Sequence, residues 1–309
     1  MCRERLILGG DDMKKLIKTK KNTFDYINIC LTIFMMFIML YPLWYVLVGS
    51  LNEGQDYMRG GVYFWPRKFT LSNYQAVFSD NTILQAFWIT ILKCIIGTAT
   101  SLFFTAMTAY AITRPGLKFK KFYIPFIMIT MFFNGGLIPY FILINGLGLF
   151  DSFWVYIIPG LFSAYNMIII QSFIREISQS LVESAKIDGA SEYRIFLSII
   201  IPLSKPVLAT IALFTLVGHW NSYFDSMMYT NSQELQTIQL FLKKVITDPA
   251  VASRLGSATV TTIPEQATKL TPQVIKMATM IVTALPIITV YPFLQKYFAK
   301  GFTMGAVKE

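Results

Sequence analysis

Six apolar stretches, each long enough to cross a lipid bilayer, divide this chain of 309 residues. A helix that crosses the hydrocarbon core needs about 20 consecutive, mostly apolar residues. Such a stretch must be helical, because an unpaired backbone N–H or C=O group is costly in lipid. The sequence therefore predicts an all-α, polytopic membrane protein with six transmembrane helices, at residues 26–49, 86–112, 122–144, 153–174, 205–225 and 276–297.

The charged residues favour a membrane protein over a nucleic-acid-binding one. Only 14% of the residues are charged, against about 25% in soluble domains. The net charge of +10 comes from Lys and Arg residues that flank the apolar stretches, as is typical of membrane proteins. The three cysteines, Cys2, Cys30 and Cys94, form no paired motif, so we expect neither a disulfide framework nor a metal site.

The distribution of basic residues predicts the orientation in the membrane. With a cytoplasmic N-terminus, 18 of the 27 Lys and Arg residues fall on the cytoplasmic side and eight outside. Basic residues concentrate in the cytoplasm, so both termini are predicted to be cytoplasmic. The first stretch is too long for the core of a signal peptide, and we expect it to be retained. Translation from Met1 or from Met13 stays open.

This orientation divides the chain into five regions. They are a cytoplasmic tail (1–25), a first transmembrane helix (26–49), an extracytoplasmic loop (50–85), a transmembrane core (86–297) and a cytoplasmic tail (298–309).

The cytoplasmic connection after the fourth stretch, about residues 178–203, predicts two short helices joined by an elbow. Ser180 and Glu183 have the spacing of a capping box, which starts a helix. Gly189 can adopt the left-handed conformation that ends one, and Ser191 can cap a second, amphipathic helix. Pro202 closes the segment before the fifth stretch. A hairpin this small is no domain, and we expect it to dock into another protein.

The same segment resembles the EAA loop of ATP-binding-cassette (ABC) importer permeases. The family pattern is Glu-Ala-Ala, three residues, Gly, nine residues and Ile-x-Leu-Pro. This sequence has Glu183-Ser184-Ala185, then Gly189, then Ile199-x-Ile201-Pro202 at the same spacing. Ser for Ala and Ile for Leu are small changes in volume. The resemblance covers residues 20 to 309 and implies the type I ABC importer permease fold.

In that family the loop sits in a groove of a separate ATPase subunit and transmits its closure to the membrane helices. The resemblance implies that Glu183 pairs with a cation in the groove, that Gly189 permits the turn, and that Ala185 and Ala190 keep the contact close. Glu183 could instead only complete its own helix cap. Asp188 could be a further contact or a solvated helix end.

The resemblance is strongest to the carbohydrate-uptake, maltose-permease-like class and, through residues 291–308, to its oligosaccharide branch. It implies import of oligosaccharides, uronate-containing ones among them, across the cytoplasmic membrane of a bacterium. The implied partners are a second related permease, an ATPase dimer and an extracytoplasmic binding protein. The chain has no phosphate-binding loop, so we expect no catalytic residue and no cofactor here, with ATP and Mg²⁺ on the partner ATPase.

A permease of the same superfamily for a non-sugar solute, such as an amino acid or an ion, remains an alternative. An intramembrane enzyme is disfavoured because the stretches carry no catalytic set of side chains. A channel is disfavoured because it would give no reason for the cytoplasmic hairpin.

A sugar path through the bilayer would need polar and aromatic side chains inside the stretches. The candidates are Asn134, Asn166, His219, Trp220, Asn221 and Tyr223. Each has a structural alternative, since amides in membrane helices also bond neighbouring helices. Lys93 could face an anionic sugar, but it lies only about two turns from the outer surface, and we expect it to snorkel there.

Overall fold

The computed structural model describes the backbone of residues 23–133, 135–260 and 270–305, and the side chains within these ranges except those of 257–260 and 291–305. Most of the predicted N-terminal tail, with both candidate start sites, lies outside the described residues. Within them the chain is helical, and its only bridge between extended segments joins Asn52 and Phe69.

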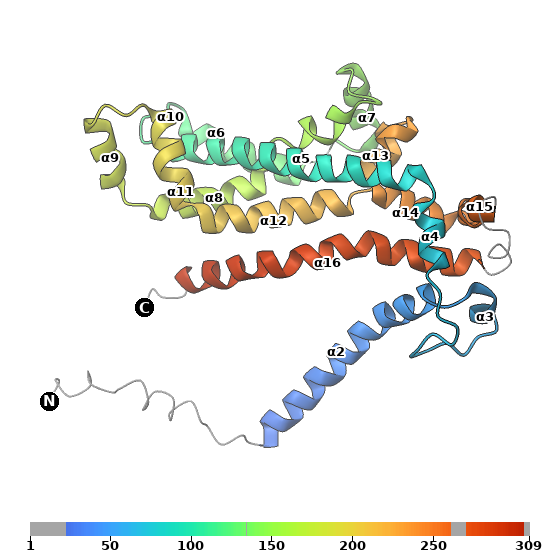
Figure 1. Ribbon diagram of the computed structural model, residues 1–309. Helices are drawn as coiled ribbons and strands as arrows, with labels where there is room; N and C mark the ends of the chain where they lie inside the picture. The colour runs from blue at the N-terminus through green and yellow to red at the C-terminus, as the bar shows by residue number, and fades with distance from the viewer. Residues whose placement is uncertain (1–22, 134, 261–269, 306–309) are drawn as a thin grey trace.

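Three of the predicted transmembrane helices form as long, uninterrupted helices: α2 (Thr23–Ser50), α5 (Asn81–Thr113) and α16 (Pro272–Gly305). The Asp80 carboxylate begins α5 by accepting a hydrogen bond from the Thr82 N–H, at 2.8 Å. α16 continues past the predicted sixth span and takes in most of the predicted tail at 298–309. Figure 1 shows α5 and α16 running lengthwise with α12 (Lys205–Asn221) between them.

The other predicted spans are interrupted, and the one predicted at 122–144 forms two helices instead of one. α6 (Lys120–Phe132) and α7 (Leu137–Gly146) meet at 115°. Gly135 and Gly136 lie in the break. The φ of Gly136 is +86°, which is outside the α-helical region and is favourable for glycine. Three described helices are long and apolar enough to cross a membrane, or up to six if each bent pair counts as one span.

The predicted fourth span, 153–174, begins as two short 3₁₀ turns. η1 (Phe153–Tyr156) and η2 (Ile158–Gly160) precede α8 (Ala164–Glu176), with a bend of 47° between the stretch Phe153–Gly160 and α8. The Pro159-Gly160 pair interrupts the helix. The predicted fifth span, 205–225, becomes α12 and then the short α13 (Phe224–Tyr229).

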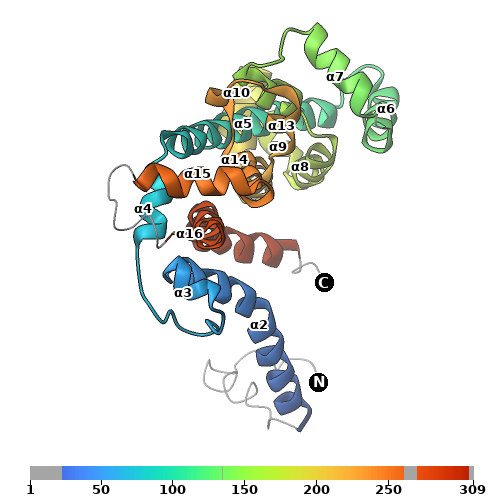
Figure 2. The ribbon, with the colours of Figure 1, turned by 90° about the vertical axis from the view of Figure 1, so that its right-hand side faces the viewer.

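α2 stands apart from the other long helices. In Figure 2 it leans away from the bundle and approaches it only near its C-terminal end. Its buried residues are Val48, Gly49 and Ser50, and its principal contact is with α16. The rest of α2 exposes large apolar side chains from Phe24 to Trp44. A helix that is apolar all round matches a lipid environment or a partner's membrane helix.

The short helices gather at the two ends of the bundle (Figure 1). At one end lie α9 (Gln179–Ile187), α10 (Glu192–Ile195), η3 (Phe196–Ile200) and α11 (Ile201–Leu203). At the other end lie α3 (Gly54–Met58), α4 (Ser72–Phe78), α13, η4 (Gln233–Leu235), α14 (Ile238–Thr247) and α15 (Pro249–Val260). Each end has its own buried apolar cluster.

The loop between α2 and α5 is folded around a buried carboxylate. Asp56 accepts hydrogen bonds from the Asn52 amide at 3.0 Å and from Arg67 Nε at 3.1 Å. The Asn73 amide donates to the carbonyl oxygens of Ser50 and Asn52. The hydrogen bond from Asn52 and the charge of Arg67 lower the pKa of Asp56 below its usual 3.8. These bonds tie the end of α2 to α4.

Candidate functional site

The segment from α9 to α11 forms the predicted two-armed hairpin, with its elbow at Gly189. The Gly189 φ is +76°. The Ala190 N–H donates to the Ala185 carbonyl at 2.9 Å, and the Gly189 N–H donates to the Lys186 carbonyl at 3.0 Å. These two bonds make a Schellman motif, which satisfies the last carbonyl groups of α9. The predicted role of Gly189 as the helix terminator therefore agrees with the backbone.

The start of α9 differs from the prediction. The helix begins at Gln179, with Ser178 in the N-cap position. Ser180 is therefore already inside the first turn, and its hydroxyl pairs with that of Ser178 at 2.7 Å. The predicted capping box of Ser180 and Glu183 is wrong, because the helix starts two residues too early for that spacing. The alternative in which Glu183 serves only to complete a capping box is therefore excluded.

α9 has an outward face that nothing in the described chain covers. Ser180, Glu183, Ser184 and Ile187 are exposed, and their spacing of three and four residues puts them on one side of the helix. The Ile187 side chain is 86% exposed. An apolar side chain this exposed beside a carboxylate is typical of a protein-binding face. Asp188, at the C-cap of α9, is also exposed.

The inward face of α9 packs on the chain itself. Val182 is buried, and Ala185 and Ala190 are half-buried against the same apolar cluster as Ile174 and Phe196. The two alanines join the ends of the Schellman motif, where an apolar contact is common. The structure thus gives Ala185 and Ala190 a role in closing the hairpin, whereas the resemblance implied a role at the partner contact.

The second arm begins as predicted and ends differently. Ser191 Oγ accepts a hydrogen bond from the Arg194 N–H at 3.3 Å, which confirms the predicted cap. Pro202 lies inside α11 and is exposed, and the preceding turn, η3, is π-helical. A proline lacks the N–H that would pair with the carbonyl four residues earlier. The chain bends by 82° after Leu203, where α12 begins.

Ile199 and Ile201 of the motif lie on the packed side of this arm. Both are half-buried against the cluster that contains Ile195 and Ile200. They hold the second arm on the bundle, so that α9 projects from a fixed base.

Sequence reasoning missed the polar network that fixes the hairpin to α5. Glu192 Oε2 accepts a hydrogen bond from the Tyr110 hydroxyl at 2.6 Å, and Glu192 Oε1 pairs with Lys186 Nζ at 2.5 Å. The Arg114 guanidinium lies over the Tyr110 ring, 4.3 Å from its centre. Tyr110 and Glu192 are 82 residues apart, so no local sequence pattern could pair them.

The predicted path residues that the structure describes have different surroundings. Asn134 lies outside the described residues. Asn166 is half-buried in the first turn of α8, where its N–H donates to the Ser163 hydroxyl. Asn221 and Tyr223 are exposed, and Lys243 Nζ lies 4.5 Å from the centre of the Tyr223 ring. Asn221 and Tyr223 flank the junction between α12 and α13.

Trp220 and His219 occupy tighter sites. Trp220 is buried, packs on Phe87 and donates its indole N–H to the Thr283 carbonyl at 3.3 Å, so it joins α12 to α5 and α16. His219 lies against Gly97 of α5, where an added Cβ would meet the imidazole Nε2 at 2.7 Å. Gly97 is therefore needed for the close approach of α12 to α5.

Lys93 does not snorkel, so that prediction is wrong. Its side chain is 0% exposed, and its Nζ lies 3.4 Å from Asp225 Oδ2 and 4.8 Å from the centre of the Tyr156 ring. Asp225 is 41% exposed and also accepts a hydrogen bond from the Ser222 hydroxyl at 2.7 Å. A carboxylate from the first turn of α13 thus holds the ammonium inside the bundle. The sequence distance of 132 residues hid this partner.

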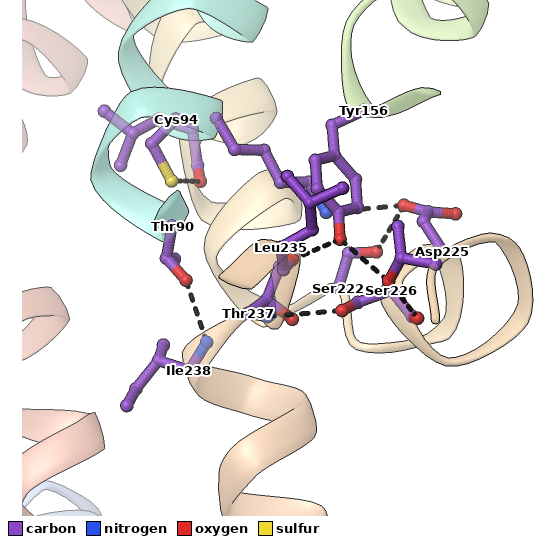
Figure 3. Close-up of polar contacts among 12 residues, drawn as sticks. Thr90, Cys94, Tyr156, Ser222, Asp225, Ser226, Leu235, Thr237 and Ile238 are labelled. Atoms are coloured by element: carbon purple, nitrogen blue, oxygen red, sulfur yellow. Dashed lines mark hydrogen bonds and ion pairs between the residues drawn. The ribbon is translucent and has the colours of Figure 1, made fainter. Parts of the chain in front are cut away.

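Hydrogen bonds around this ion pair join five elements, α5, η1, α13, η4 and α14 (Figure 3). The Tyr156 hydroxyl donates to the Leu235 carbonyl at 2.6 Å. The Ile238 N–H donates to the Thr90 hydroxyl at 2.9 Å, and the Thr237 N–H donates to the Ser226 hydroxyl at 3.2 Å. The end of the bundle at α13 and α14 is therefore a connected polar assembly.

Comparison with known proteins gives consistent matches over most of the chain. Residues 109–304 match the family model of the binding-protein-dependent transport system inner membrane component. Protein LplC of Bacillus subtilis (strain 168) is 36% identical over 94% of this chain and 99% of LplC. The polygalacturonan/rhamnogalacturonan transport system permease protein YtcP of the same bacterium is 34% identical, with the same two coverages.

A solved structure agrees with these sequence matches. One chain of a bacterial ABC transporter involved in the import of the acidic polysaccharide alginate is similar with a TM-score of 0.82 and 30% identity. The match covers 94% of this chain and 99% of that chain. The helical bundle, the projecting hairpin and the matches along nearly the whole length lead to one assignment: this chain belongs to the family of binding-protein-dependent transport system inner membrane components.

Proposed function

We propose that this permease couples solute import to a separate ATPase through the outward face of α9. The supporting observation is the division of α9 into two faces. Val182 and Ala185 fix one face to the bundle, while Glu183, Ser184 and Ile187 leave the other open. A rigid base with an uncovered carboxylate and an uncovered apolar side chain suits docking into a groove of a partner.

The orientation and the other partners belong to the same proposal. The α9 end of the bundle carries Arg114, Lys118, Lys120, Lys121 and Lys186, and the positive-inside rule puts such an end in the cytoplasm. The α13–α15 end would then face a binding protein outside the cytoplasmic membrane of a bacterium, with both termini inside. The exposed apolar length of α2 suits contact with a second, related permease or with lipid.

The cargo we propose is an oligosaccharide, with uronate-containing ones included. Support comes from the relatives: YtcP is named for polygalacturonan and rhamnogalacturonan transport, and the similar structure for alginate import. A related permease from Halalkalibacterium halodurans, 26% identical, is named for arabinooligosaccharides. A non-sugar solute remains the alternative, and a panel of labelled solutes with the cognate binding protein separates the two.

Transport would proceed by movement of the hairpin on its partner. Closure of the ATPase pair displaces α9, and the second arm passes this displacement to α12 through the bend after Leu203. α12 ends beside the polar assembly around Lys93 and Asp225. One helix therefore links the two ends of the bundle and can carry a displacement of the hairpin to the opposite end.

Cross-linking tests the docking face. In a background without native cysteines, we expect Ser184→Cys and Ile187→Cys to capture the ATPase in intact membranes. Val182→Cys is the matched control, because Val182 is 4% exposed on the inward face of the same helix. Absence of any nucleotide-hydrolysing partner at both outward positions would overturn the proposal.

A charge reversal tests the role of Glu183. The Glu183→Lys variant should insert and assemble, because Glu183 is exposed. We expect at least tenfold slower uptake, equivalent to a barrier about 1.4 kcal/mol higher. Uptake of labelled cargo into proteoliposomes measures this, with Glu176→Lys on the neighbouring helix as the control. Normal uptake in Glu183→Lys would exclude a coupling role.

A further inference from the structure

The start of α6 borders a groove whose charged lining residues are all basic. Pro115, Leu117, Phe119, Lys120, Lys121, Phe122 and Ile124 line an open groove of about 690 Å³. No Asp or Glu occurs between Arg114 and Phe150. Neither lysine forms a salt bridge within the described residues, and the groove is complementary to an anion.

The two lysines also lie at the N-terminal end of α6, where a positive charge is unfavourable. Lys120 and Lys121 form the first turn of α6, which is the positive end of its dipole. Cations there are unfavourable unless an anion offsets them. The Lys120 ammonium reaches the Thr113 carbonyl only at 3.5 Å. Among the residues that the structure describes, no anion offsets these two charges.

The apolar part of the groove is uncovered. Phe119 is 70% exposed and Phe122 is 72% exposed, with ring centres 6.5 Å apart. Phe119 has a φ of +60°, a left-handed conformation that is strained for an aromatic residue. α6 buries no residue in this chain and lies at the edge of the bundle in Figure 2. Aromatic rings beside lysines at the end of a membrane helix are placed at the level of lipid headgroups.

We propose that this groove binds the phosphate headgroup of an anionic phospholipid, with Lys120 and Lys121 on the phosphate and Phe119 and Phe122 against the glycerol and upper acyl chains. The inference rests on the membrane placement proposed above, but it is independent of the cargo. The charge complementarity favours a headgroup with a net negative charge over a zwitterionic headgroup, whose own cation offsets its phosphate.

The groove adjoins the base of the hairpin. Pro115 and Leu117 also line a second open pocket of about 530 Å³, which Arg114, Lys186 and Glu192 border. Arg114 stacks on Tyr110, which donates to Glu192. A bound headgroup would lie next to the network that fixes α9, so anionic lipid should also raise cargo-stimulated ATP hydrolysis.

Native mass spectrometry of the complete transporter, titrated with phosphatidylglycerol or phosphatidylcholine, tests the site. We expect tighter retention of phosphatidylglycerol, and roughly fivefold weaker retention in Lys121→Gln, since one basic residue near an anionic headgroup contributes about that factor. Lys118→Gln is the matched control, because Lys118 is exposed in the same connection but does not line the groove. Its retention should change less than twofold.

Three outcomes would overturn the proposal. Equal losses in Lys118→Gln and Lys121→Gln would mean diffuse surface attraction rather than a site. Unchanged retention in Lys121→Gln would mean that a second subunit covers the groove in the assembled transporter. Displacement of the lipid by an equal concentration of inorganic phosphate would mean a free-anion site. None of these measurements uses transport, so a failure here leaves the proposed function standing.

Discussion

Lys93 and Asp225 are unequal partners in their ion pair. The Lys93 side chain has no exposure, whereas Asp225 is 41% exposed and keeps a hydrogen bond from Ser222. Loss of the lysine therefore leaves a carboxylate that water can still solvate. Loss of the carboxylate leaves a buried ammonium whose remaining charge-stabilising contact, among the described residues, is the face of the Tyr156 ring. Burial of an uncompensated charge is the more costly of the two.

This asymmetry predicts different effects of two single substitutions. We expect Asp225→Asn to lower the free energy of unfolding by about 2 kcal/mol or more. Lys93→Met, which keeps the volume, should cost less than about 1 kcal/mol. Thermal unfolding midpoints of the purified protein in detergent compare them, and Lys93→Met/Asp225→Asn should recover most of the loss. Equal losses in the two single variants would contradict the burial argument.

At the scale of elements, the hairpin between α9 and α10 depends on the left-handed backbone conformation of Gly189. An Ala at its φ of +76° should cost about 1 kcal/mol through strain alone, as nothing lies within 4 Å of the added Cβ. Gly148, with a φ of +67° and equally open surroundings, is the matched control. Both Ala variants should lose similar stability, but only Gly189→Ala should weaken cargo-stimulated ATP hydrolysis. Equal losses of ATP hydrolysis in the two variants would exclude a specific role of the hairpin geometry in coupling.

The elements also show how far sequence reasoning reached. Apolar length located the long helices α2, α5 and α16 to within a few residues at most ends, and glycine and serine chemistry located the elbow at Gly189 and the cap at Ser191. The breaks at Gly135-Gly136 and Pro159-Gly160 were missed, because hydropathy averages over such pairs. The start of α9 was misplaced because two serines compete for the cap.

Pairings between distant elements lay beyond the sequence altogether. Lys93 meets Asp225 across 132 residues, and Tyr110 meets Glu192 across 82. Local periodicity carries no record of which helices pack together. The sequence predicted the features of the candidate site that lie within residues 178–203. It did not predict the contacts that packing makes between this segment and α5.

At the scale of the whole molecule, one folded loop joins α2 to the rest of the bundle. The Asn73 amide donates hydrogen bonds to the carbonyl oxygens of Ser50 and Asn52 at the end of α2. Asn52 and Arg67 donate to the Asp56 carboxylate in the same loop. Apart from this loop, α2 contacts chiefly α16. The position of the first membrane helix therefore depends on a carboxylate that must stay ionised.

Acid should loosen this attachment before it unfolds the bundle. The folded-state pKa of Asp56 is depressed below 3.8 by Asn52 and Arg67, so its contribution is fully present above that value and is lost as the pH falls through the folded pKa. Hydrogen exchange of residues 51–73 should therefore quicken below about pH 3.8. Asp56→Asn should show little of this step, whereas Glu53→Gln, which removes only the partly exposed contact to Lys68 at 3.7 Å, should keep it. An unchanged step in Asp56→Asn would assign the acid sensitivity to another group.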